Sequence, residues 1–408
     1  MDSDRRRVTL TDIAFGGDCV GRIDNQVLFA SYGLPGEEVI VEFSENKRDY
    51  RRGRVVEVIK PSPARVEPRC RFFGQCGGCR WQHIDYPTQV ALKRNIVVDQ
   101  LRRIGGFSDE VPVNPTLSAE QPWRYRNHAR FTARKGQLGF FVEGSRQFAA
   151  VDECHIVHPV INKVLASVQG KLPHHLHQVA VRCATNTGQL LINPDPGVRG
   201  IASSTLGAAF TANGKIGQGR TYLEEEILRR RFRIDPVSFF QVNTPQAERM
   251  VRYIIEQLQP VKTDTVLDVY CGVGTFGLSI ADKAARVIGI EESKPALRDA
   301  RYNAREADNV EFILGAAEDV LAHIEECVDA AIIDPPRAGC KREVIRELRR
   351  LRPSRIVYVS CDPATLARDL KLFCADASYK IVDVQPVDMF PQTYHVESII
   401  LMTNSGSD

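Results

Sequence analysis

The sequence predicts a protein of mixed α/β class whose C-terminal part is a doubly wound, essentially parallel sheet. From about residue 245 onward, short apolar runs alternate with helical stretches, which is typical of a Rossmann-like sheet covered by helices. The first sixty residues instead carry short strand patterns broken by turns, which favours a small barrel of the OB type. Between these parts lie a cysteine cluster, one helix and several strands, so we expect a central α+β region.

The N-terminal barrel is predicted from runs of β-branched or alternating apolar residues. These runs are 8–13, 26–30, 38–43 and 53–59. Glycines at 16–17 and a Gly-Leu-Pro-Gly turn at 33–36 separate them. A proline-rich stretch at 61–68 is typical of a linker, so we expect the barrel to span residues 1–62.

The central region, residues 63–240, is predicted to hold one long helix at 88–104. Its strand patterns are 130–134, 179–183, 189–192 and 221–225. Cys70, Cys76 and Cys79 form a tight group, and the glycines at 77 and 78 let the backbone wrap around an ion or cluster. Thiolates at this spacing suit either a [4Fe–4S] cluster or structural zinc, and the spacing alone leaves both open.

The C-terminal region, residues 241–408, is predicted to be the doubly wound sheet. Its strands are expected at 265–269, 287–290, 310–314, 330–333, 356–359, 381–386 and 398–402, and its helices at 247–257, 277–283, 294–307 and 364–372. Ligands of such sheets bind beyond the carboxyl ends of the strands. Polar residues that directly follow an apolar strand are therefore the first candidates for a functional site.

The composition excludes several classes of protein. The chain has 408 residues, too many for one ordinary domain, and a net charge of only +3, so it is no strongly basic coating protein. Its 11 cysteines are too sparse for a disulfide scaffold. The first residues lack the apolar core of a signal peptide, and no run approaches the length of a membrane span. We therefore expect a cytoplasmic protein without membrane contact, in which clustered cysteines bind metal or take part in catalysis.

A glycine-rich loop at 268–277 follows one apolar strand and begins a helix. Its G-x-G-x-x-G pattern lets the backbone approach a ligand closely, and Glu291 ends the next strand, where it could bind a ribose. Both a dinucleotide and S-adenosylmethionine fit this pattern. Asp268 favours S-adenosylmethionine, because its carboxylate would repel a pyrophosphate.

Three further polar residues lie at the ends of predicted strands. Asp334 follows one predicted strand, and the two prolines after it stiffen the backbone. Cys361 stands at the end of the next strand, and Glu397 directly precedes the last one. Because Cys361 stands beside the start of a helix, we expect the pKa of its thiol to be lowered, which favours the nucleophilic thiolate. Glu397 matters only if it faces Cys361.

These motifs occur together in one known family. Phe-Phe-Gln-Val-Asn at 239–243, the loop at 268–274, Asp-Pro-Pro-Arg at 334–337, Ser-Cys-Asp-Pro at 360–363 and His-Val-Glu-Ser at 395–398 stand in this order. The chain thereby resembles the RNA uracil-C5 methyltransferases that use S-adenosylmethionine, and its barrel resembles their TRAM domain. The resemblance implies that Cys361 is the nucleophile that attacks uracil C6 and that Glu397 is the base that removes the C5 proton. Phe239 and Phe240 fit equally well beside the base or cofactor and in the core.

The same resemblance implies the other ligand sites. The S-adenosylmethionine site would be lined by Gln241, Tyr270, Thr275, Glu291 and Asp334, and the [4Fe–4S] cluster would be bound by Cys70, Cys76, Cys79 and Cys154. At Thr275 some members have asparagine, and the hydroxyl still allows a polar contact.

The expected function is therefore formation of 5-methyluridine in RNA by a monomeric enzyme. Relatives with both barrel and cluster tend to act on large-subunit ribosomal RNA, which favours 23S rRNA over tRNA. Basic runs at 47–54 and 341–355 and arginines 124, 126, 130 and 134 suit a phosphate backbone. An NAD-dependent iron–sulfur oxidoreductase is the alternative from another class, and the sequence does not identify the uridine.

Overall fold

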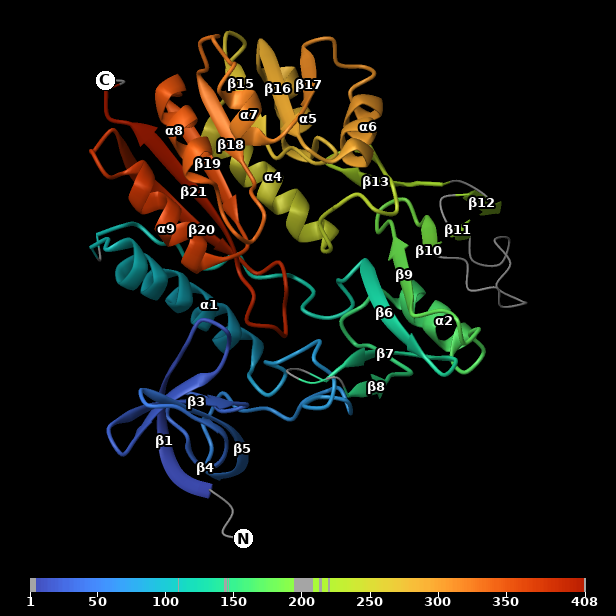
Figure 1. The fold of residues 1–408 in the computed structure, drawn as a ribbon, viewed down its shortest axis with the longest axis vertical. Coiled ribbons are helices and arrows are strands. Elements are labelled where there is room, and N and C mark those ends of the chain that lie inside the picture. The colour runs from blue at the N-terminus through green and yellow to red at the C-terminus, as the bar shows by residue number, and fades with distance from the viewer. Residues whose placement is uncertain are drawn as a thin grey trace.

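The computed structural model describes residues 5–108, 110–142, 145, 147–193, 208–212, 215–218 and 221–406. Figure 1 shows the barrel at one end, the C-terminal sheet at the other, and helix α1 between them. Among the described residues, no helix is long and apolar enough to cross a membrane.

The N-terminal strands close into a barrel in the order β1-β2-β3-β5-β4. The strands are β1 (Arg5–Ile13), β2 (Cys19–Ile23), β3 (Gln26–Ser31), β4 (Glu38–Asn46) and β5 (Tyr50–Lys60). Leu10, Leu28 and Val39 fill the interior, and Trp81 from the following segment joins the same core. The four predicted strands are confirmed, and β2 is an additional strand.

The central sheet has seven strands in the order β12-β11-β10-β9-β6-β7-β8. The strands are β6 (His128–Arg134), β7 (Gln137–Phe141), β8 (Phe148–Ala150), β9 (Gln178–Cys183), β10 (Leu190–Asn193), β11 (Ala208–Ala212) and β12 (Lys215–Gln218), and helix α2 spans Pro159–Val168. Arg130 and Arg134 share the exposed face of β6, whereas Arg124 and Arg126 precede the strand.

Helix α1 (Tyr86–Gln100) continues as a π-helical turn, Leu101–Gly105. The carboxylate of Asp85 caps its first turn by accepting from the backbone N–H of Thr88. On one face of α1, Ile96 packs into the core of the barrel, and on another face Val97 packs into the core of the C-terminal sheet. The helix therefore ties the barrel to the C-terminal sheet.

The C-terminal sheet has seven strands in the order β17-β16-β15-β18-β19-β21-β20. They are β15 (Thr265–Val269), β16 (Arg286–Glu291), β17 (Val310–Leu314), β18 (Ala330–Ile333), β19 (Arg355–Ser360), β20 (Tyr379–Val387) and β21 (Glu397–Asn404). Strand β21 runs antiparallel to both of its neighbours, while the pairs from β17 to β19 are all parallel. The predicted doubly wound sheet is confirmed, with one antiparallel strand inserted near its edge.

Helices cover both faces of this sheet. On one face lie α4 (Thr244–Leu258), α5 (Thr275–Ile280) with the 3-10 turn Ala281–Lys283, and α6 (Lys294–Asn303); on the other lie α7 (Ala317–Leu321), α8 (Arg342–Leu351) and α9 (Pro363–Phe373). The hairpin β13 (Leu223–Ile227) and β14 (Arg230–Ile234) packs Phe232 and Ile234 into the same core as α4. The predicted limits between the three regions, after residues 62 and 240, stay predictions.

Candidate active site

The candidate residues lie at one edge of the C-terminal sheet. Val269 pairs with Ile333, and Ile333 pairs with Tyr358, so β15, β18 and β19 end side by side. Tyr270 and Asp334 each directly follow one of these ends. The pairing therefore brings together residues that are far apart in the sequence.

Cys361 and Glu397 face one another across the antiparallel pair β19–β21. Ser360 pairs with Ser398, so the next position on each side is occupied by Cys361 and Glu397. Burial, together with the charges of Glu397 and Asp334, raises the pKa of the Cys361 thiol to about 12. Glu397 therefore faces Cys361, as it must if the two side chains act together.

The expected lowering of the pKa of the Cys361 thiol by the start of α9 is wrong. The side chain of Asp362 caps this helix and accepts from the backbone N–H groups of Ala364 and Thr365, each at 3.1 Å. These donors are thereby taken by a neighbouring carboxylate, which itself raises the pKa of the thiol. A raised pKa favours the neutral thiol of Cys361 over its thiolate at neutral pH.

Glu397 is only 5% exposed and is the first residue of β21. Burial and the charge of Asp334, opposed by the guanidinium of Arg337, raise the pKa of its carboxyl to about 8. Burial, with the charge of Asp268, likewise raises the pKa of Asp334 to about 7. Two carboxyl groups that bind protons near neutral pH thus lie beside a thiol, an arrangement suited to proton transfer.

The glycine loop between β15 and α5 has an unusual backbone conformation. Tyr270, Gly272 and Gly274 have left-handed backbone conformations with φ values of 65°, 57° and 85°. Thr275 is the first residue of α5, and a Cβ built on Gly272 would meet no atom within 4 Å. The loop therefore turns sharply and keeps open space beside its backbone.

Two carboxylates hold this loop in place. Glu291 accepts from the backbone N–H of Gly272 at 2.9 Å and of Ser293 at 2.7 Å. Asp268 accepts from the N–H of Gly277 at 2.7 Å through Oδ2, while its buried Oδ1 has no partner. Burial raises the pKa of Asp268 to about 7.

Gln241 lies in the segment directly before α4. It is buried, and its backbone carbonyl accepts a hydrogen bond of 3.1 Å from the side-chain amide of Asn127. Phe240 is 4% exposed and belongs to the core, whereas Phe239 is 66% exposed. Of the two phenylalanines, Phe239 alone is free to contact a ligand.

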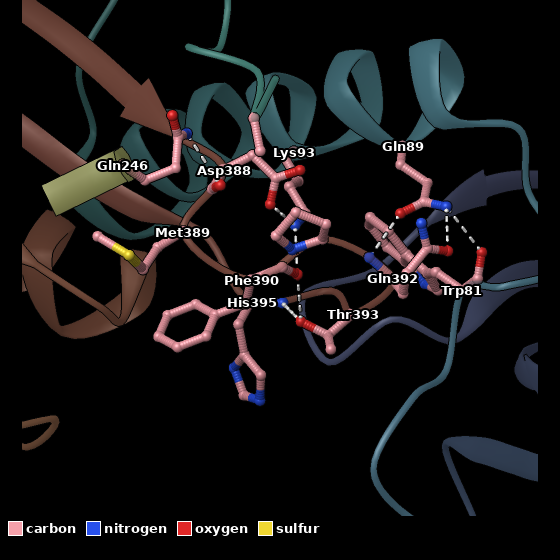
Figure 2. A network of polar contacts seen from close by, with 12 residues as sticks. Trp81, Gln89, Lys93, Gln246, Asp388, Met389, Phe390, Gln392, Thr393 and His395 are labelled. Atoms are coloured by element: carbon pink, nitrogen blue, oxygen red, sulfur yellow. Dashed lines mark hydrogen bonds and ion pairs between the residues drawn. The ribbon is translucent and has the colours of Figure 1, made fainter. Parts of the chain in front are cut away.

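A buried polar network, which the sequence analysis missed, holds the loop 388–396 that leads into Glu397 (Figure 2). Lys93 from α1 forms an ion pair with Asp388 at 2.5 Å, and both side chains are 0% exposed. Lys93 also donates to the carbonyl of Phe390 at 3.0 Å, and Gln246 donates to that of Asp388 at 3.0 Å. Nothing in the local sequence of α1 marks Lys93 as a partner of this loop.

Comparison with known proteins identifies the chain. The family model of the tRNA (uracil-5-)-methyltransferases matches residues 211–405, and that of the TRAM domain matches residues 3–56. A protein of Caldanaerobacter subterraneus named as an RNA methyltransferase is 37% identical, with 98% of each chain covered, and one of Thermosynechococcus vestitus is 35% identical over 97% of each. The chain belongs to this family.

A solved structure extends the likeness to the whole chain. The tRNA (uracil-54, C5)-methyltransferase of Pyrococcus abyssi, in complex with S-adenosyl-L-homocysteine, has a TM-score of 0.77 and 27% identity, with 97% of this chain and 99% of that chain covered. The protein is therefore an RNA uracil-C5 methyltransferase that depends on S-adenosylmethionine. Membership of the family favours S-adenosylmethionine over a dinucleotide, the two ligands that fit the pattern of the glycine loop. It gives no support to the alternative of an NAD-dependent oxidoreductase.

The four predicted cluster ligands, Cys70, Cys76, Cys79 and Cys154, line one cavity of about 300 Å³. Cys154 is fixed by two hydrogen bonds of 2.9 Å with Asn162, and the backbone N–H of Gly78 lies 3.4 Å from Cys76 Sγ. Among the described residues, no three His, Cys, Asp or Glu side chains come close enough to hold a metal ion. The fold thus gathers the predicted thiols around a shared space without a preformed site for a single ion.

Proposed function

We propose that the enzyme methylates C5 of one or more uridines in a structured RNA through a covalent bond between Cys361 and uracil C6. The pairing of Ser360 with Ser398, which sets Cys361 opposite Glu397, is the observation that carries this proposal. A nucleophile and a base on adjacent strands can reach neighbouring atoms of one ring. The target ring must leave its stack to enter such a site.

The chemistry explains why both residues are needed. Uracil C5 is a poor nucleophile, and addition of the Cys361 thiolate to C6 moves electron density onto C5. When bound, S-adenosylmethionine supplies an electrophilic methyl group and a positive charge. Once C5 carries both methyl group and proton, Glu397 removes the proton, the S–C6 bond breaks, and the ring regains its double bond. The thiol is returned, and one proton is released per cycle.

Arg337 influences the protonation of Cys361 and Glu397. Its guanidinium lowers the pKa of both Cys361 and Glu397, against the effect of burial and of Asp334. Cys361 must lose its proton before attack, and Glu397 must be ionised before it can accept one. We therefore assign Arg337 the role of favouring both charged forms.

The methyl donor fits the cradle of the glycine loop. Its hydroxyl groups would meet Glu291, and its remaining contacts would come from Gln241, Tyr270, Thr275 and Asp334. The open side of Gly272 and the unpartnered Oδ1 of Asp268 support a polar ligand here. Isothermal titration with S-adenosylmethionine should show binding in the wild type and in Cys361→Ala, while only the wild type methylates RNA. Normal turnover by Cys361→Ala would refute the mechanism.

We propose 23S ribosomal RNA as the substrate, because the chain combines a barrel with four clustered cysteines. Transfer RNA is the second candidate, which the family description and the likeness to the P. abyssi enzyme favour. Mapping 5-methyluridine in both RNAs, with and without the gene, decides between them. Loss of the modification from tRNA alone would overturn the ribosomal assignment.

We also propose that Cys70, Cys76, Cys79 and Cys154 bind a [4Fe–4S] cluster. Four thiols around one cavity fit a group that is larger than a single ion. Because uracil methylation involves no net redox step, we assign the cluster a structural role. Purification without oxygen should yield about four irons and four sulfides per chain. Cys154→Ser should lose them, and zinc in place of iron would contradict the proposal.

A further inference from the structure

Three aromatic rings on the loop 388–396 have no role in the proposed chemistry. The ring centroids of Tyr394 and His395 lie 4.2 Å apart with planes inclined by 37°, and Phe390 meets His395 edge-on at 5.9 Å. All three side chains are partly exposed, and Glu397 follows two residues after His395. In Figure 2 the rings of Phe390 and His395 project from the loop on the side away from α1.

The buried side of the loop keeps these rings in place. Gln392 exchanges two hydrogen bonds with the side chain of Gln89, and its carbonyl accepts from the backbone N–H groups of Arg80 and Trp81. Tyr394 packs tightly against Gly17 of the barrel. A Cβ added to Gly17 would lie only 2.8 Å from the ring of Tyr394. The rings are thus fixed before any ligand arrives, which reduces the entropy lost on binding.

Cationic side chains lie close to the rings. The guanidinium of Arg80 lies 5.9 Å from the centroid of Tyr394 and is itself held by Gly16 and Asp18. Burial, together with the charges of Arg337, Lys93 and Arg126, lowers the pKa of His395 to about 4. His395 is therefore a neutral flat ring beside cationic side chains, which suits a nucleic acid base with its phosphate.

Arginine and aromatic side chains continue from this place onto the barrel. Asp18 binds both Arg80, at 2.5 Å, and Arg52 of β5, at 3.1 Å. Arg52 in turn lies over the ring of Phe29 at 5.2 Å. One row of stacking and charged groups thus leads from the barrel to the loop that precedes Glu397.

We propose that Tyr394 and His395 form a stacking site for one unpaired nucleotide of the substrate RNA. This nucleotide is the neighbour of the target uridine on the side of the RNA strand that leads toward the barrel. This inference rests on the proposed function. A neighbouring base held on these rings keeps the strand open while the uridine occupies the catalytic site. Single-stranded RNA is commonly bound by such exposed rings beside arginines.

The test uses a fragment of the RNA that the protein methylates, with 2-aminopurine replacing each neighbour of the target uridine in turn. Stacking on Tyr394 and His395 should quench the fluorescence of the probe at one neighbour in the wild type. Tyr394→Ala should abolish this quenching and raise the KM for RNA roughly 5- to 150-fold, with little change in kcat. Tyr394→Phe should behave as the wild type.

Tyr302 provides a matched control. It is a partly exposed tyrosine of α6 with arginine side chains over its ring, so Tyr302→Ala should leave the KM and the quenching unchanged. Absence of quenching in the wild type would overturn the inference, even if Tyr394→Ala does not fold. A fall in kcat at constant KM would also overturn it, because the ring would then only support the loop. Failure of the wild type to methylate any uridine would instead refute the proposed function.

Discussion

Removal of the Lys93 ammonium group should destabilise the protein strongly. Lys93 and Asp388 are 0% exposed, and their charged atoms lie 2.5 Å apart. Lys93→Met keeps most of the side-chain volume but leaves the Asp388 carboxylate buried with the hydroxyl of Tyr86, at 2.9 Å, as its neutral partner. Breaking one side of a buried ion pair costs about 3–5 kcal/mol. That is a large share of the roughly 5–15 kcal/mol that stabilises a typical domain.

Urea unfolding measures this loss directly. Trp81 is fully buried with its ring 6.0 Å from Lys93 Nζ, so its fluorescence reports on the same region. The unfolding midpoint should fall by at least about 1 M urea. The double variant Lys93→Met with Asp388→Leu should recover most of the loss, because it leaves no unpaired charge. A single variant that loses less than about 1 kcal/mol, or a double variant less stable than both singles, would refute this reasoning.

Three further predictions concern the catalytic edge of the sheet. The breakdown of the methylated adduct, the step that needs Glu397 as a base, should become faster with pH up to about 8, where Glu397 ionises. Arg337→Gln should move this rise to higher pH, and an unshifted profile would exclude the proposed role of Arg337. The raised pKa of Glu397 means that the folded state keeps a proton that the unfolded chain releases, so stability falls between about pH 4.5 and 8. Glu397→Gln should therefore raise the unfolding midpoint at pH 8 but not at pH 4, as thermal scans would show. Gly277→Ala would place a Cβ 2.7 Å from Asp268 Oδ2, so calorimetry should find weaker S-adenosylmethionine binding.

The parallel strands were predictable because their sequence signal is local. The runs at 265–269 and 330–333 match β15 and β18 to the residue, since strands buried on both faces are nearly continuous apolar runs. The run at 310–314 also matches β17 to the residue, although this edge strand is only partly buried. Strand β2 was missed because its five residues, Cys-Val-Gly-Arg-Ile, include a glycine and an arginine.

The geometry of the candidate site was less predictable because it depends on distant pairings. The position of β21 between β19 and β20 sets Glu397 opposite Cys361, and no local pattern specifies that order. Lys93 and Asp388 are 295 residues apart, so only the folded chain shows their ion pair. The pKa of Cys361 was mispredicted because burial and nearby carboxyl groups outweigh the capped helix.

The decisive experiment traps the covalent bond between Cys361 and uracil C6. Glu397→Gln should attack and methylate the base but fail to remove the C5 proton, so a methylated RNA–protein adduct should persist on a denaturing gel. Peptide mapping by mass spectrometry should place the nucleotide on Cys361, and addition of Cys361→Ala to the variant should abolish the adduct. An adduct on another residue, or methylation without any adduct in Glu397→Gln, would contradict the mechanism.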